Sequence, residues 1–105
     1  MKSKYLKSPI SQRLRFARTS KDLSQKQLGI LAGFDEFSAS PRINQYERDK
    51  HVPDFSTAKR LADALEIPVT YLYSDHDELA ELILLFSTSS QHTKKSIMER
   101  LKNNK

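Results

Sequence analysis

The sequence predicts an all-α fold, with five helices in one domain and two further helices behind it. Apolar residues recur at the three- and four-residue spacings of amphipathic helices. The chain has only two glycines, Gly29 and Gly33, whereas the tight turns of a strand-rich protein usually require more. A share of 37% apolar residues in 105 is enough for one modest core.

The first helix is predicted to begin at Ser8-Pro9, with the proline at its first helical position. Ile10, Leu14 and Ala17 then fall on one face. We expect this face to pack against the core.

The second helix is predicted from the capping box S-x-x-Q at residues 24–27. Leu28 and Leu31 are expected to face inward. Gly29 lies inside this helix, where glycine costs about 1 kcal/mol relative to alanine. We therefore expect another helix to approach closely at Gly29, and Gly33 suits the helix end.

The third and fourth helices each have a capping signal. Ser40 is predicted to cap the third helix, with Pro41 at its first position and an end near Arg48. Asp54 is predicted to cap the fourth helix. The residues of the fourth helix expected to face inward are Phe55, Ala58, Leu61, Ala62 and Leu65.

The C-terminal part is predicted to hold three more helices. Residues 69–72 form one short helix, Asp75 and Glu78 form an acidic capping pattern for the next, and residues 91–102 form the last. The last two carry more apolar residues than a five-helix domain needs. We expect them to form a homodimer interface, the alternative being that both pack on their own domain. The predicted interface residues are Leu79, Leu82, Ile83, Phe86, Ile97, Met98 and Leu101.

Charge is unevenly distributed along the chain. Residues 1–60 hold 13 Lys or Arg and 6 Asp or Glu, residues 61–91 hold 6 acidic and no basic residues, and residues 92–105 hold 5 basic and 1 acidic. A basic front half indicates a polyanionic partner, the alternative being solubilising charge. We divide the chain into a basic arm (1–8), a domain predicted to bind this polyanion (9–73) and a C-terminal helical extension (74–105).

Several classes of protein are excluded or disfavoured. The chain has no cysteine, which excludes disulfides and cysteine-based zinc sites. It has no apolar run near the roughly 20 residues that span a bilayer, and its start lacks the apolar core of a signal peptide, so a cytoplasmic location is predicted. The acidic residues 75–78 suit a helix N-terminus better than acid–base catalysis. We expect no enzyme activity, no metal site and no cofactor.

The segment SASPRINQYERDKHVPD suggests a helix-turn-helix, because it follows a short capped helix after a tight connection. The second helix of such a motif presents polar side chains to base edges in the major groove. Arg42 suits guanine, and Asn44 or Gln45 suits adenine. Ile43 and Tyr46 are expected to turn inward.

Over about residues 10–73 the chain resembles the lambda-repressor-like (Xre-type) helix-turn-helix regulators. The resemblance lies in RLRFARTSKDLSQKQLGILAGF, RINQYERDKHVPD and AKRLADALEIPVTYLY. They contain the family's L-S-Q-x-x-L, its I-x-x-hydrophobic-E segment and its P-[SD] helix start. The chain departs from the family in a connection about four residues longer (the surplus being DEFS) and in Asp49, which replaces a common glycine.

The resemblance implies roles for individual residues. It implies base contacts by Ser40, Arg42, Asn44 and Gln45, and backbone contacts by Gln25, Lys26, Arg48 and Lys50. It also implies an ion pair between Arg18 and Glu47 that ties the first helix to the end of the third. The arginines of the first helix, Arg13, Arg15 and Arg18, are further candidates for phosphate contacts.

The function predicted from these features is a small bacterial or phage-type transcriptional regulator that acts as a repressor and binds a palindromic DNA operator as a homodimer. Two alternatives share the fold. One is an antitoxin that masks a toxin protein through its tail, and the other is the controller protein of a restriction–modification system.

Overall fold

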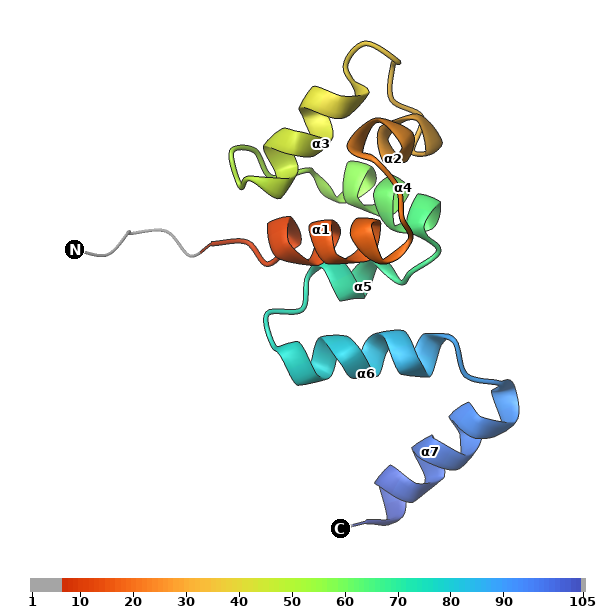
Figure 1. Ribbon diagram of the computed structural model, residues 1–105. Coiled ribbons are helices and arrows are strands. Elements are labelled where there is room, and N and C mark those ends of the chain that lie inside the picture. Colours follow the sequence, from red (N-terminus) through yellow and green to blue (C-terminus); the bar gives the residue numbers. More distant parts are fainter. Residues whose placement is uncertain (1–6, 105) are drawn as a thin grey trace, which may run out of the picture.

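The computed structural model describes residues 7–104, and this part of the chain contains seven helices and no strand. The helices are α1 (Ile10–Ser20), α2 (Gln25–Leu31), α3 (Ala39–Glu47), α4 (Phe55–Leu65), α5 (Val69–Leu72), α6 (Asp77–Ser87) and α7 (Gln91–Asn103) (Figure 1). The predicted all-α fold class is confirmed. The predicted arm at residues 1–8 lies, except for Lys7 and Ser8, outside the described residues.

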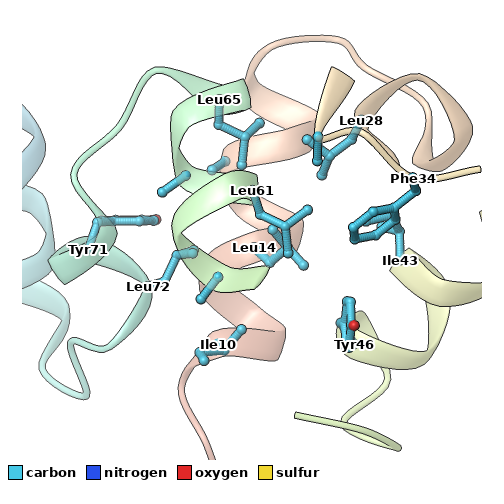
Figure 2. Packing of buried hydrophobic residues seen from close by; sticks show 14 of the residues in the cluster. Ile10, Leu14, Leu28, Phe34, Ile43, Tyr46, Leu61, Leu65, Tyr71 and Leu72 are labelled. Atoms are coloured by element: carbon cyan, nitrogen blue, oxygen red, sulfur yellow. The ribbon is translucent and has the colours of Figure 1, made fainter. Parts of the chain in front are cut away.

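Helices α1 to α5 enclose one hydrophobic core (Figure 2). Leu14 of α1 and Leu61 of α4 are fully buried near its centre, and Ile10 and Ala17 complete the buried face predicted for α1. Burial of each such leucine contributes about 1.5–3 kcal/mol. Buried residues of α2 and α3 also belong to this core, which thereby fixes the positions of both helices.

The α2–α3 pair is held together by the two features predicted for α2. The Ser24 hydroxyl accepts from the Gln27 amide N–H at 3.0 Å, while the Gln27 side chain accepts from the Ser24 N–H at 2.8 Å. A Cβ on Gly29 would lie 2.6 Å from the Cβ of Ala39, which is closer than a Cβ approaches a non-bonded atom in real proteins. Gly29 therefore permits a close crossing of α2 and α3, and Gly33 ends the turn with φ of +90°.

Two residues expected to face the core are exposed instead. Leu31 is 60% exposed, because the buried face of α2 runs through Leu28, Gly29 and Ala32 and so turns away from it. Phe55 is 61% exposed at the first position of α4, beyond the edge of the core. Its ring instead stacks on Tyr73, with the ring centroids 6.4 Å apart.

Two predicted helix starts are also wrong. Ser38, rather than Ser40, holds the N-cap position of α3, so Pro41 is the third helical residue. Proline fits there because N–H groups of the first helical turn have no partner within the helix. The N-cap position of α6 is held by His76 rather than Asp75, although Asp77 and Glu78 do supply an acidic first turn.

The last two helices lie outside the core of α1 to α5. Helix α6 lies along α5, and Ala80, Ile83 and Leu84 pack toward the core. Helix α7 diverges from α6 after the turn (Figure 1) and has no buried residue. Within residues 7–104, no helix is both long and apolar enough to cross a membrane.

Candidate nucleic-acid interface

The inner face of α3 is buried in the core, and its outer face is exposed. Ala39 and Ile43 are fully buried on the inner face. Pro41, Gln45 and Arg48 are exposed at positions i, i+4 and i+7 and so share the outer face. The outer face thus presents the amide of Gln45 and the guanidinium of Arg48 beyond Pro41.

A buried carboxylate holds the end of α3 in place. The Glu47 side chain is only 2% exposed and accepts two hydrogen bonds from the Arg18 guanidinium, at 2.6 and 2.9 Å. Arg18 also donates to the carbonyl of Leu23 at 2.8 Å. The hydrogen bond to Glu47 raises the pKa of Arg18 above its ordinary value, although burial acts in the opposite direction. The predicted partners Arg18 and Glu47 therefore meet as a bidentate ion pair.

Gln25 connects α2 to the same network. Its side-chain nitrogen donates to Oε1 of Glu47 at 3.1 Å and to Oδ1 of Asn44 at 3.2 Å. One glutamine thereby joins the start of α2 to two successive turns of α3. Asn44, which is half-buried, turns its oxygen toward α2, while its NH₂ group remains available as a donor.

Arg42 lies on the opposite flank of α3, toward α4. Its guanidinium carbon is 3.9 Å from the centre of the Phe34 ring, and its Nη2 donates to the Tyr46 hydroxyl at 3.1 Å. The guanidinium of Arg60 lies 5.3 Å from the same ring. Phe34 is thus a platform that orients Arg42 while most of the Arg42 donors stay free.

Positively charged residues flank this surface, and one of them, Lys26, is in an ion pair. Arg48 and Lys50 are exposed at the end of α3, where Asp49 adopts the left-handed conformation (φ +60°) in which the family often has glycine. Lys26 lies 3.7 Å from Glu36 in an exposed ion pair with the α2–α3 connection. Arg15 is exposed on α1.

Arg13 does not belong to this surface, contrary to its prediction as a phosphate contact. It is only 8% exposed, and its Nε donates to the carbonyl of Ser74 at 2.9 Å. Its Nη2 forms an ion pair with Asp77, also at 2.9 Å. Arg13 therefore connects α1 to the start of α6.

The structure brings most of the predicted DNA-contacting residues onto or beside α3 and places one further residue, Pro41, on its outer face. Ser40 is half-buried at the second helical position, on the side of α3 that bears Asn44 and Glu47. Pro41 occupies the outer face although it was interpreted only as a helix-starting residue. Its spacing of four residues from Gln45 is the signal that places it on the same face.

The predicted dimerisation residues lie apart from this surface, on α6 and α7. Leu79 and Leu82 are 50% and 45% exposed, and Met98 and Leu101 are 43% and 57% exposed. Ile83, Phe86 and Ile97 are half-buried. Within the described residues, no group of three or more His, Cys, Asp or Glu side chains is placed to hold a metal ion.

Comparisons with known proteins agree with this geometry. A family model described as a helix-turn-helix domain matches residues 11–78, from α1 into the first turn of α6. Among solved structures, the transcriptional regulator BswR is similar to this chain, with 49% sequence identity and a TM-score of 0.84 over 88% of this chain and 91% of the other. No curated protein matches the chain. The chain belongs to the helix-turn-helix domain family, in agreement with its resemblance to the Xre-type regulators.

Proposed function

We propose that this protein is a transcriptional regulator that binds a palindromic DNA operator as a homodimer and represses by occupying a promoter. The observation that carries the proposal is the construction of α3. Its inner face and its end are fixed by the core and by the carboxylate of Glu47, while its outer face presents hydrogen-bond donors and acceptors. The 49% identity to a transcriptional regulator supports the same function.

In this proposal α3 is the recognition helix and lies in the major groove. Gln45 is exposed on the outer face and has the amide group that pairs with adenine N6 and N7. Arg42, oriented by Phe34, has the fork that pairs with guanine O6 and N7. Asn44 and Ser40 lie on the α2 side of the helix and contact bases or sugar at the edge of the groove.

The cations around α3 supply affinity that is independent of base sequence. Arg48 and Lys50 contact phosphates beyond the end of the helix, and Lys26 and the backbone N–H of Gln25 contact phosphates at the start of α2. Each phosphate neutralised by a cation releases counterions, so binding weakens as salt concentration rises. Loss of a base contact should therefore change the preference for sequence, whereas loss of a phosphate contact should change the salt dependence of binding.

A homodimer with twofold symmetry places two copies of α3 on two half-sites related by inversion, which is why the operator is proposed to be palindromic. The antitoxin and restriction-modification alternatives use the same fold with another partner or genetic setting. These alternatives, the repressor role and the cytoplasmic location stay predictions.

Binding of two variants to an enriched duplex and to random duplex tests the division of roles. Arg42→Ala should cost about 1–3 kcal/mol on the enriched duplex and relax the preference at one base position. Lys50→Ala should weaken binding to both duplexes alike and reduce the slope of log K against log salt by about 0.9. Lys59→Ala, an exposed change on α4, is the matched control. Equal weakening of both duplexes by Arg42→Ala would show that Arg42 does not discriminate bases.

A further inference from the structure

Helix α6 is apolar on two sides, and its own domain covers only one of them. Ala80, at 1% exposed, packs inward together with Ile83 and Leu84. Leu79, Leu82 and Leu85 are 50%, 45% and 59% exposed. A helix that is apolar nearly all round is normally buried nearly all round. The uncovered side of α6 therefore lacks a partner within the described chain.

Helix α7 needs a partner for a different reason. It has 13 residues, and none of them is buried. Isolated helices of roughly 12–15 residues are marginal in water, so such a helix depends on packing for its stability. Its apolar stripe consists of Ile97, Met98 and Leu101, and the last two are 43% and 57% exposed.

Part of each uncovered face lines one groove, which includes Leu82 of α6 and Met98 and Leu101 of α7 but neither Leu79 nor Leu85. The groove has a volume of about 390 Å³ and its walls are almost entirely apolar. Leu82, Ile83 and Phe86 of α6 form one wall, and the apolar stripe of α7 forms the other. Figure 1 shows why it is open: α7 leaves the turn at an angle and diverges from α6 along its length.

The charges of the two helices are complementary. Helix α6 begins with Asp77, Glu78 and Glu81 and has no basic residue, whereas α7 has four basic residues and one glutamate, Glu99. Near the turn between the two helices, Lys94 of α7 lies 5.6 Å from the Phe86 ring of α6. Asp77 is already paired with Arg13, so Glu78 and Glu81 are the carboxylates of α6 that can meet the cations of another helix.

We propose that the occupant of this groove is α7 of a second copy of the chain, and that the exchange is reciprocal. Two α6–α7 hairpins then interlock as a four-helix bundle with twofold symmetry. The lengths match, since α7 spans about 20 Å and α6 about 17 Å at 1.5 Å per residue. This proposal rests on the homodimer of the proposed function and specifies how the two copies are joined.

Engineered disulfides test the exchange directly, because the chain has no cysteine of its own. A size-tagged Leu82→Cys chain is mixed with a Met98→Cys chain and oxidised. Reciprocal exchange predicts a mixed disulfide between the two chains that forms faster than either self-linked dimer. Ser56→Cys, an exposed position on α4, replaces Leu82→Cys as the control and should yield little mixed product.

Sedimentation supplies the second readout. The wild-type chain should sediment as two copies at tens of micromolar, and Leu101→Glu should raise the dissociation constant at least about 10-fold while retaining the helix content. A wild-type monomer at that concentration would overturn the proposal. A dimer in which Met98→Cys links only to itself would also overturn it, because α7 would then pack on α7.

DNA selection by the same proteins distinguishes this proposal from the proposed function. If Leu101→Glu is monomeric and still enriches a half-site, α3 recognises DNA without the bundle, and the bundle accounts for pairing alone. If the wild-type chain forms the mixed disulfide but enriches no DNA sequence, the exchange is supported while the proposed function fails.

Discussion

Removal of the Glu47 carboxylate should destabilise the fold more than removal of any exposed charge. The side chain is 2% exposed and accepts hydrogen bonds from Arg18 and Gln25. Loss of one partner of a buried ion pair costs about 3–5 kcal/mol, because the other charge remains without compensation. We expect Glu47→Ala to lower the free energy of unfolding by about that amount, a large share of the about 5–15 kcal/mol of a typical domain.

A double variant checks the loss in free energy of unfolding expected for Glu47→Ala. Arg18→Met with Glu47→Leu removes both charges and fills their space with apolar atoms, so it should cost less than Glu47→Ala alone. Urea unfolding followed by circular dichroism measures each free energy. The control is Asp63→Ala, which breaks the exposed pair with Lys59 and should cost under about 1 kcal/mol. A cost under about 1 kcal/mol for Glu47→Ala, or additive costs for the two charges, would refute the reasoning.

Three further predictions follow from the packing and the caps. Gly29→Ala should cost about 1–3 kcal/mol in urea unfolding, because the new Cβ meets Ala39 at 2.6 Å, and a stabilised variant would contradict the close crossing. The hydrogen bond from the backbone N–H of Thr57 lowers the pKa of Asp54 below its ordinary 3.8. The stabilisation by the Asp54 carboxylate is therefore present above pH 3.8 and is lost as the pH falls through the lower pKa of the folded state. Asp54→Asn should remove this part of the acid sensitivity, which unfolding midpoints measured down to about pH 2 would show. Arg13→Ala should lower the unfolding midpoint but leave the salt dependence of DNA binding unchanged, and a reduced salt slope would place Arg13 at the DNA.

Local signals in the sequence predicted the positions of all seven helices. The capping box at Ser24 and the inward Ile43 and Tyr46 follow from local chemistry and helical spacing, and the structure has each of them. Gly29 also predicted a tertiary contact, since its cost inside a helix is offset only by a close neighbour.

The errors arose where tertiary context decides. The spacing of Leu31 suits an inward face, but the close crossing at Gly29 rotates α2 away from it. Arg13 is the clearest case, because the hydrogen-bond acceptors that hold it belong to Ser74 and Asp77, 61 and 64 residues away along the chain. No local pattern distinguishes such an arginine from an exposed one such as Arg15.

Tertiary context also decides the contacts of the candidate nucleic-acid interface around α3. The family pattern predicted that Arg18, Gln25 and Glu47 act together, and the structure gives their common basis in one buried carboxylate. The role of Phe34 as a platform for Arg42 was not predicted, because the longer α2–α3 connection separates the two residues in the sequence.

Selection of bound sequences from a random duplex pool tests the central claim most directly, at about 150 mM salt so that weak electrostatic binding is suppressed. The mass of the purified complex is determined alongside. We expect an enriched inverted repeat bound by two chains. A pool without enrichment, with binding that disappears as salt rises, would contradict recognition of DNA sequence by α3.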